Sequence, residues 1–583
     1  MCPDSAQDPM TNQRRAAPWI ALACLLLVSS GLFLQNLGAA YITLWDEAIH
    51  VNVIRNMAEH CCLPRLHPSA DLGIKYQDWT NNTVWLHKPL LPFFVTTASY
   101  KLLGGSLWAF RLPGAIFALL TAVVIFLIGR AFLGGLAGLF GAAIFALNPY
   151  TNQLVHGTEY SGFVDLMFAF FASVALYLIL AWTQSRSPAA LRWLGLVLAF
   201  GYMCKGGLAL APFAVLGVII VLTRSIRDFI PALQAVLVFG VLVLPEKLYW
   251  LAHHSAEFRF EQRMQLLHLF RVVEGHGGSW LSYFAGYLPS MLEFPLVPFA
   301  YFSIGWALVR CKPGAPGFTL SIWTLVYLVP LSLAASKIEN FVFAVLPAIA
   351  LLVPHAMETL MRSRRFRWVL SLCVSSAGIY ILSRATQGYE HQNRLALFAA
   401  AAIGVAALAM LYWMRFDSNA VTMSVLALAS VCLFSLYVRR DILANTADPV
   451  DSSAQAAVRQ AGLDLRPLVP KDSLILAHDN TVVLAYLYVM YWSGVDALDV
   501  CREPWPARSV ARLRERKNMY LITKSRLPAV PLGRLAMGDL YSLTGIPFEV
   551  WSPIAAGACQ SLPAQERKLL RQTRSFYGPE SAR

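Results

Sequence analysis

Apolar residues along this chain come in long runs that are separated by short polar gaps. A run of about 20 apolar residues is long enough to cross the hydrocarbon core of a bilayer as a helix. Because backbone groups in lipid must hydrogen-bond within their own segment, such runs form helices rather than open strands. The runs cover residues 18–38, 111–129, 133–149, 163–182, 191–204, 206–223, 230–250, 284–309, 317–335, 340–359, 367–384, 394–414 and 419–438. This pattern predicts an all-α polytopic membrane bundle of about 13 transmembrane helices.

The basic residues between the runs indicate how the bundle is oriented. Arg14 and Arg15 precede the first run, which is longer than the apolar region of a typical signal peptide and therefore predicts an uncleaved anchor. Cytoplasmic loops carry an excess of Lys and Arg, so the N-terminus is expected in the cytoplasm. The gaps that are then cytoplasmic contain Arg130, Arg186 with Arg192, Arg224 with Arg227, Arg310 with Lys312, the arginines of 362–367, and Arg415.

A shorter apolar stretch, residues 89–103, would invert all of these assignments if it were a full span. We therefore interpret it as a juxtamembrane or re-entrant helix. The same orientation places the loops 40–110, 150–162, 251–283 and 336–340 on the outer side of the membrane.

The pattern changes after about residue 440. Residues 1–439 are expected to form the transmembrane domain, and residues 440–583 a small extracytoplasmic α/β domain. Short apolar stretches at 473–478 and 519–523 predict strands, and residues 507–517 predict a basic helix. An oxidising compartment would permit a disulfide between Cys501 and Cys559, while the adjacent Cys61 and Cys62 receive no assignment.

The composition agrees with a membrane protein and excludes a nucleic-acid partner. Hydrophobic residues make up 57% of the chain and charged residues 14%, against roughly 45–50% and about 25% in soluble domains. The net charge of +14 could indicate nucleic-acid binding, but most basic residues lie in the short gaps between apolar runs. The expected surroundings are membrane lipids.

Acidic residues at the outer ends of the predicted spans are the first candidates for chemistry. Asp46 and Glu47 follow the first span directly, and Asp165 lies among apolar residues at the mouth of another. An ionisable group at membrane depth costs several kcal/mol unless it is solvated or paired, so it is a functional candidate by default. The alternative is that Asp46 and Glu47 are solvated loop residues that cap the following helix.

Basic residues return to the same side of the membrane at Lys88, Lys205, Arg271 and Lys337. Any one of them would more often be an interfacial side chain that reaches for water. Four cations and at least two carboxylates on one face suit a phosphate head group beside an acid that accepts a proton. If the phosphate carries a sugar, one carboxylate could activate a hydroxyl that attacks the anomeric carbon of that sugar directly. Such a direct attack would invert the anomeric centre.

Six short segments, distributed over residues 40–360, carry a resemblance to a known family. They are Trp45-Asp46-Glu47, His87-Lys88-Pro89-Leu90, the surroundings of Asp165, Lys205-Gly206, His268 to Arg271, and Ser336-Lys337 followed by Pro347. In their order, spacing and side, they resemble the membrane-embedded C-type (GT-C) glycosyltransferases. The aminoarabinose–lipid A transferases and the protein O-mannosyltransferases are the most similar groups.

The resemblance implies a role for each candidate residue. Asp46 would be the catalytic base, with Glu47 and Asp165 as further acidic members of the site. Lys88, Arg271, Lys205 and Lys337 would bind the donor phosphate. Substrate contacts would come from His50, Trp85 and His268, of which His50 and Trp85 stand where relatives often carry an aromatic residue.

The resemblance also implies a reaction and a layout. A sugar would move from a polyprenyl-phosphate donor to a lipid A, glycan or protein acceptor on the periplasmic face, with inversion. Two positions depart from the family pattern: Leu90 stands where relatives usually carry a second proline, and Phe341 where they commonly carry tyrosine. Phe341 has no hydroxyl to offer a phosphate, so aminoarabinose specificity does not carry over.

Two alternatives remain at the level of sequence. A transporter or flippase of lipid-linked saccharides should place polar groups near the bilayer midplane in a repeated architecture, whereas the charges here lie at one interface. An assembly protein with a partner-binding tail would leave the charges without a role. A divalent metal has weak candidates in His87 and His268, but the irregular spacing favours hydrogen-bonded histidines, and no cofactor is certain.

Overall fold

The computed structural model describes residues 12–39, 42, 46–67, 84–157, 162–272, 276–292, 296–361, 449–477, 485–499 and 516–559. Within them, six helical stretches are long and apolar enough to cross a membrane: Leu107–Phe132, Phe163–Ser185, Pro188–Leu222, Phe229–His253, Pro316–Leu333 and Glu339–Thr359. Three shorter apolar helices cover Pro18–Leu34, Gly135–Ala146 and Leu296–Arg310. The protein is therefore a multi-pass membrane protein. The predicted spans 367–384, 394–414 and 419–438 lie outside the described residues.

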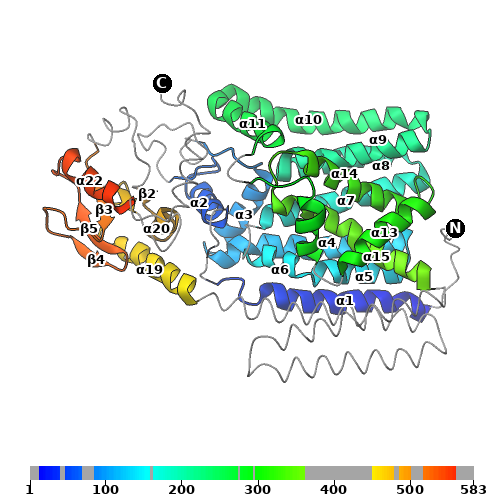
Figure 1. The fold of residues 1–583 in the computed structure, drawn as a ribbon, viewed down its shortest axis with the longest axis horizontal. Coiled ribbons are helices and arrows are strands. Elements are labelled where there is room, and N and C mark those ends of the chain that lie inside the picture. The colour runs from blue at the N-terminus through cyan, green and yellow to red at the C-terminus, as the bar shows by residue number, and fades with distance from the viewer. Residues whose placement is uncertain are drawn as a thin grey trace, which may run out of the picture.

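The apolar helices lie roughly parallel in one elongated bundle (Figure 1). Its helices are α1 (Asn12–Leu34), α4 (Leu107–Phe132), α5 (Gly135–Ala146), α7 (Phe163–Ser185), α8 (Pro188–Lys205), α9 (Ala211–Leu222), α10 (Phe229–His253), α13 (Leu296–Arg310), α14 (Pro316–Leu333) and α15 (Leu346–Met361). A short 3₁₀ turn, η1 (Gly206–Leu210), connects α8 to α9.

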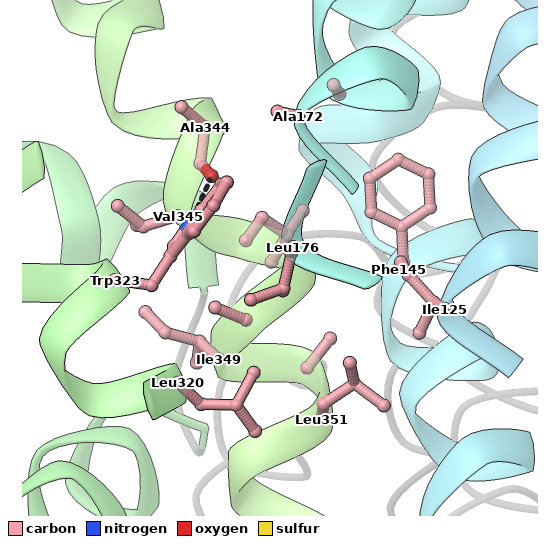
Figure 2. Packing of buried hydrophobic residues seen from close by; sticks show 14 of the residues in the cluster. Ile125, Phe145, Ala172, Leu176, Leu320, Trp323, Ala344, Val345, Ile349 and Leu351 are labelled. Carbon is pink, nitrogen blue, oxygen red and sulfur yellow. Dashed lines mark hydrogen bonds between the residues drawn. The ribbon is translucent and has the colours of Figure 1, made fainter. Parts of the chain in front are cut away.

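The bundle packs through small residues and interlocking apolar side chains. Helices α4 and α5 touch at Gly129 and Gly138, where a Cβ added to Gly129 would lie 2.1 Å from the Gly138 Cα. Small residues at such crossings let helices in membranes approach closely. Figure 2 shows the neighbouring core, where the buried Trp323 indole donates a hydrogen bond to the Ala344 carbonyl at 3.2 Å.

Two predicted spans are interrupted in the structure. The run 133–149 divides into α5 and α6 (Pro149–His156), because Pro149 starts a new helix and the Asn148 side chain caps it by accepting from the Tyr150 amide at 2.8 Å. The run 284–309 divides into η3 (Ser282–Tyr287), α12 (Leu288–Leu292) and α13.

The stretch interpreted as juxtamembrane forms α3 (Leu91–Leu102), which has 12 residues. A helix of that length is about 18 Å long, well short of the roughly 30 Å hydrocarbon core. Its length agrees with a helix that does not cross the membrane.

Ion pairs identify the two ends of the bundle. At one end, Arg186 after α7 contacts Asp228 before α10 with an N–O distance of 3.0 Å. At the other end, Lys205 at the end of α8 contacts Asp165 at the start of α7 at 2.5 Å. Helix α8 runs from the first of these ends to the second. Most of the candidate residues lie at the second end, the one with Asp165 and Lys205.

A mixed five-stranded sheet follows in the sequence at 474–542. Its strands are β1 (Leu474–Ala477), β2 (Asp496–Asp499), β3 (Met519–Thr523), β4 (Gly533–Leu535) and β5 (Gly538–Ser542), in the order β2-β1-β3-β5-β4. Strand β1 is parallel to β2 and β3, while β5 is antiparallel to β3 and β4. Helices α19 (Pro449–Leu465), α20 (Ala485–Ser493) and α22 (Phe548–Cys559) accompany it.

The two strands predicted from the sequence are confirmed as β1 and β3. The predicted basic helix 507–517 lies almost entirely outside the described residues, and so does the predicted disulfide between Cys501 and Cys559.

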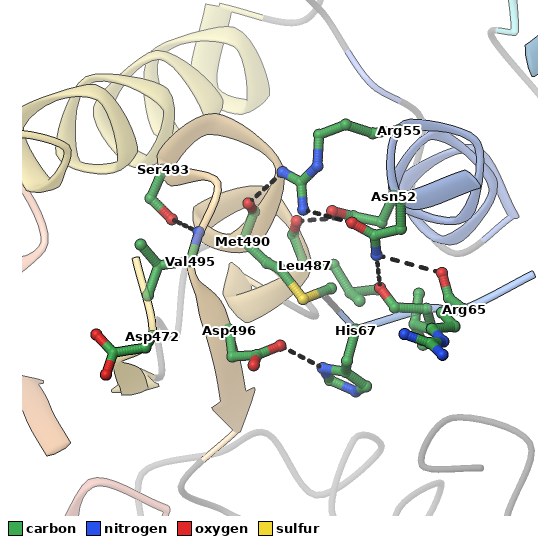
Figure 3. Close-up of polar contacts among 12 residues, drawn as sticks. Asn52, Arg55, Arg65, His67, Asp472, Leu487, Met490, Ser493, Val495 and Asp496 are labelled. Carbon is green, nitrogen blue, oxygen red and sulfur yellow. Dashed lines mark hydrogen bonds and ion pairs between the residues drawn. The ribbon is translucent and has the colours of Figure 1, made fainter. Parts of the chain in front are cut away.

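The sheet region docks on α2 (Asp46–Glu59), the helix that begins with the candidate acids. Arg55 donates to the carbonyls of Met490 and Tyr491 at 2.6 and 2.8 Å, and Asn52 donates to Leu487 at 2.9 Å (Figure 3). These carbonyls belong to α20. The Met490 carbonyl also accepts from the Gly494 amide at 3.0 Å, so Arg55 adds a second donor there. Residues of α2 and α20 also share one apolar core.

We expect Arg55→Ala to destabilise the full-length protein by about 1.5–3 kcal/mol, the range for a hydrogen bond to a charged group. Arg55 is buried, so water cannot replace its guanidinium at the α20 carbonyls. The measurement is the thermal unfolding midpoint in detergent micelles. Arg466→Ala is the matched control, because Arg466 also donates to a carbonyl, that of Trp492 at 2.7 Å, but in an exposed position. Equal thermal midpoints for the two variants would show that the Arg55 hydrogen bonds do not hold α20 on α2.

Candidate active site

Asp46 and Glu47 open helix α2, where acidic side chains are favoured by the helix dipole. Successive residues on a helix project about 100° apart, so the two carboxylates face different surroundings. Asp46 is partly exposed, whereas Glu47 is fully buried.

The Glu47 carboxylate is held in a two-pronged ion pair by Arg111 of α4. The Arg111 Nε and Nη2 atoms lie 2.7 and 3.0 Å from the two Glu47 oxygens. Arg111 also donates to the carbonyls of Leu37 and Ala39, both at 3.1 Å. Gly157 packs so closely that a Cβ there would lie 2.3 Å from the Glu47 Oε1. This geometry suits a structural ion pair between α2 and α4, while the catalytic role of Glu47 stays a prediction.

Asp46 lies in a positive electrostatic environment. Burial opposes its ionisation, but the charges of Lys88, His50, Lys205 and His87, in decreasing order, outweigh that effect and lower the pKa of Asp46 to about 2. Asp46 is therefore a carboxylate at neutral pH. The interactions also bring Asp46 together with both lysines, as the sequence predicted.

Asp165 is the centre of a buried polar cluster at the start of α7. Its Oδ1 accepts from the Lys205 ammonium at 2.5 Å, and its Oδ2 accepts from the Asn340 amide at 3.0 Å. The Lys205 Nζ also lies 5.0 Å from the centroid of the Phe341 ring, a cation–π contact. Phe341, which lacks the hydroxyl usual in relatives, thus contributes its ring face to the site.

Asn340 and Phe341 belong to η4 (Glu339–Val345), a 3₁₀ helix that connects the bundle end to α15. Asn340 is not among the site residues predicted from the sequence. It lies in the segment 336–340 between two apolar runs, where the sequence singled out Lys337 alone.

His50 lies one helical turn after Asp46, and three aromatic rings pack against its imidazole. Its ring centroid is 5.6 Å from Trp85, 5.0 Å from Phe93 and 5.6 Å from Phe163. Burial, the largest cause, lowers the pKa of His50 to about 3, so the imidazole is neutral. Both His50 and Trp85, the predicted substrate contacts, are almost fully buried. Phe93 and Phe163 were missed because they lie within apolar runs.

The segment that carries Lys88 is fixed by helix α11 (Ser255–Phe270). His87 Nδ1 lies 3.1 Å from the buried Glu261 carboxylate, and Gln265 donates to the His87 carbonyl at 3.2 Å. The half-buried Lys88 side chain makes no hydrogen bond to any residue that the structure describes, so its ammonium is available to an anion.

The segment after α11 pairs with the 335–337 turn. Ser336 donates its amide to the His268 carbonyl and its hydroxyl to the Arg271 carbonyl, both at 2.9 Å, and Lys337 donates its amide to the His276 carbonyl at 2.7 Å. Arg271 has an exposed side chain. These backbone contacts place the segments that carry Arg271 and Lys337 side by side.

The Lys337 side chain, which was predicted to bind the donor phosphate, contacts the end of α14 in this structure. Its buried ammonium donates to the carbonyls of Ser332 at 2.8 Å and of Ala334, at the end of α14. A cation there satisfies the last carbonyls of the helix and complements its dipole. Such a lysine is not free to bind a phosphate.

His268 lies in the last turn of α11, and its carbonyl accepts from the Ser336 amide. Burial first, and then the charges of His87, Lys88 and His276, lower the pKa of His268 to about 4, so it is neutral at physiological pH. Neutral imidazoles can bind a metal, but no group of three potential ligands is arranged for one among the residues that the structure describes.

The fold defined by this bundle is that of the membrane-embedded C-type glycosyltransferases. ArnT from Cupriavidus metallidurans, solved with bound undecaprenyl phosphate, matches with a TM-score of 0.62 over 91% of this chain and 100% of that one, at 17% identity. The same protein without ligand gives a TM-score of 0.60 at 18% identity.

Comparisons of sequence point to the same groups. Residues 87–250 match the dolichyl-phosphate-mannose-protein mannosyltransferase family. The undecaprenyl phosphate-alpha-4-amino-4-deoxy-L-arabinose arabinosyl transferase 2 of Pseudomonas fluorescens is 26% identical over 414 residues, which are 67% of this chain and 66% of that one. The resemblance to the aminoarabinose transferases and O-mannosyltransferases is therefore confirmed.

Proposed function

We propose that this protein is a glycosyltransferase that moves a sugar from a polyprenyl phosphate to an acceptor hydroxyl at the periplasmic face of the inner membrane. One observation carries the proposal: an ionised carboxylate, Asp46, lies beside Lys88, whose ammonium is not hydrogen-bonded to any described residue. A base next to an anion-binding cation is what the reaction requires. The names of the relatives, which transfer sugars from undecaprenyl or dolichyl phosphate, support this class of donor.

In the proposed reaction, Asp46 accepts the proton of the acceptor hydroxyl while that oxygen attacks the anomeric carbon. The bond from the anomeric carbon to the phosphate oxygen breaks, and the phosphate leaves with the electron pair. Lys88 and the exposed Arg271 stabilise the charge that develops on the phosphate. Attack from the side opposite to the leaving group inverts the anomeric centre.

Donor binding would also make Asp46 a better base. In the free protein the charge of Lys88 is the largest of those that lower the pKa of Asp46. A phosphate on Lys88 would cancel much of this charge, while burial would continue to raise the pKa. The carboxylate would therefore approach the basicity that suits proton transfer only when the donor is in place.

The finer layout is also part of the proposal. We place the N-terminus in the cytoplasm, count about 13 spans by the length rule, and assign residues 1–439 to the membrane and 440–583 to a periplasmic α/β domain. A reporter fused after Arg583 that is active only outside the cytoplasm would support this topology, and cytoplasmic activity would overturn it. The acceptor class is lipid A, another envelope glycan or a protein.

The reaction can be tested directly. Purified protein in lipid nanodiscs is incubated with undecaprenyl-phosphate-linked sugars, and the release of undecaprenyl phosphate is followed by mass spectrometry. Mass spectra of lipid A and of other envelope glycans, with and without the gene, identify the acceptor. The proposal fails if neither free undecaprenyl phosphate nor any gene-dependent glycan is found.

Lys88→Ala is expected to raise the donor KM by about 10- to 100-fold, because a charge-assisted hydrogen bond to phosphate is worth roughly 1.5–3 kcal/mol. Initial rates at varied donor concentration measure the effect. Lys101→Ala removes an exposed lysine at the end of α3 and serves as the matched control, with an unchanged KM. Donor dependence like that of the wild type in Lys88→Ala would exclude this residue as the phosphate ligand.

The pH dependence of kcat/KM is expected to lack an acidic limb between about pH 5 and 8, because the pKa values of Asp46 and His50 lie below that range. Asp46 is active as the carboxylate, and its lowered pKa of about 2 means that protonation would remove activity only in strong acid. His50, with a pKa of about 3, stays neutral throughout. A limb with a midpoint near the ordinary histidine value would show that a titrating imidazole takes part instead.

A further inference from the structure

Two adjacent cysteines follow the C-terminal end of α2, and the proposed reaction uses neither of them. Cys61 and Cys62 are both exposed, and their sulfur atoms lie 3.8 Å apart. The pair is therefore a vicinal dithiol, accessible from solution and already in side-chain contact.

The backbone at this pair is unusual. Cys61 has a φ of 50° and Cys62 a φ of 73°, both in the left-handed region that side chains other than glycine rarely adopt. A helix end commonly has one such residue, usually glycine or asparagine. Here the Cys62 amide donates to the Met57 carbonyl at 3.0 Å, so the helix ends through two successive left-handed cysteines. Residue types better suited to this conformation are absent from both positions.

We propose that Cys61 and Cys62 form a redox modification site that closes to a vicinal disulfide. The oxidant is a small disulfide of the glutathione type. The thiolate of one cysteine attacks a sulfur of this oxidant and releases one of its halves as a thiol. The second cysteine loses its proton and attacks the mixed disulfide, which forms the Cys61–Cys62 bond and releases the other half. The cysteines lose two electrons and two protons, and the oxidant is reduced to two thiols.

The location of the pair gives the modification a structural consequence. The chain leaves Cys62 towards Arg65 and Leu66, whose carbonyls accept from the Asn56 side chain of α2 at 3.2 and 2.8 Å. It then reaches His67, whose Nδ1 lies 3.7 Å from the Asp496 carboxylate of β2. A disulfide between Cys61 and Cys62 would close a small ring that constrains the backbone between α2 and the His67–Asp496 contact. Oxidation is therefore expected to shift the thermal midpoint of the full-length protein.

An oxidising compartment at this site rests on the proposed topology, but the chemistry of the pair does not. The test uses full-length protein in detergent, reduced and then incubated with or without oxidised glutathione. After denaturation and alkylation with N-ethylmaleimide, mass spectrometry follows the peptide that contains both cysteines. We expect an unlabelled peptide lighter by two hydrogen atoms after oxidation and a doubly alkylated one after reduction.

Single variants make the result decisive. Cys61→Ser and Cys62→Ser should each stop at a mixed disulfide with glutathione on the remaining cysteine, whereas Cys24→Ser, which alters an exposed cysteine in α1, should leave ring closure unchanged. Double alkylation after oxidation, a persistent mixed disulfide in the wild type, or a disulfide between two protein molecules would each overturn the proposal. If the ring closes in the purified protein but the pair is fully reduced in cells, the proposed topology fails and the site stands.

Discussion

Asp46→Asn is expected to lower kcat by about 100- to 10,000-fold, the range that a positioned general base contributes. The amide keeps the size of the side chain but cannot accept the acceptor's proton at neutral pH. Because Lys88 and Arg271 are unchanged, the donor KM should change little. Initial rates of undecaprenyl phosphate release at saturating donor measure the effect.

The control for this variant is Asp228→Asn. Asp228 is also paired with a basic residue, Arg186, but at the other end of the bundle. Helix α7 has 23 residues, which corresponds to about 34 Å between the two ends. Wild-type kcat in Asp228→Asn and intact elution of both variants from size exclusion would assign the loss to Asp46. Full activity in Asp46→Asn would refute the proposed base.

The sequence predicted which residues meet at this site better than it predicted what each of them does. The charge pattern predicted one common side of the membrane for Lys88, Lys205, Asp165 and Asp46, and the structure brings these residues together. The roles of Glu47 and Lys337 could not be inferred in the same way. Each depends on a neighbour that is distant in sequence or belongs to the backbone: Arg111 for Glu47, and the α14 carbonyls for Lys337.

The interruptions of the helices were likewise hidden from the hydropathy pattern. Asn148 and Pro149 lie inside a long apolar run, and averaging over that run conceals a cap and a helix start that involve only these two residues. The strands at 474–477 and 519–523 were predictable because short apolar stretches bounded by polar residues have few other ways to bury both faces. The docking of α20 on α2 had no local signal, since Arg55 looks like any other polar helix residue until its partners are known.

Arg111→Met is expected to destabilise the protein by about 3–5 kcal/mol, because it leaves the Glu47 carboxylate buried without its counter-charge. Both side chains are buried, and Arg111 also ties α4 to the carbonyls of Leu37 and Ala39. The apparent thermal midpoint and the monodisperse fraction in detergent measure the loss. A midpoint equal to that of the wild type would show that the pair does not fasten α2 to the bundle.

The partner variant separates a structural role of Glu47 from a catalytic one. Glu47→Gln removes the buried charge while keeping a hydrogen-bond acceptor for Arg111, and the double variant Glu47→Gln/Arg111→Met should regain part of the stability lost in Arg111→Met, because no charge then remains unpaired. If Glu47 is structural, kcat in the folded fraction of Glu47→Gln stays within a few-fold of the wild type. A different outcome is that kcat falls as far as in Asp46→Asn while the thermal midpoint is kept. Glu47 would then take part in proton transfer. The ion pair with Arg111 would in that case set the basicity of the Glu47 carboxylate in addition to anchoring α2.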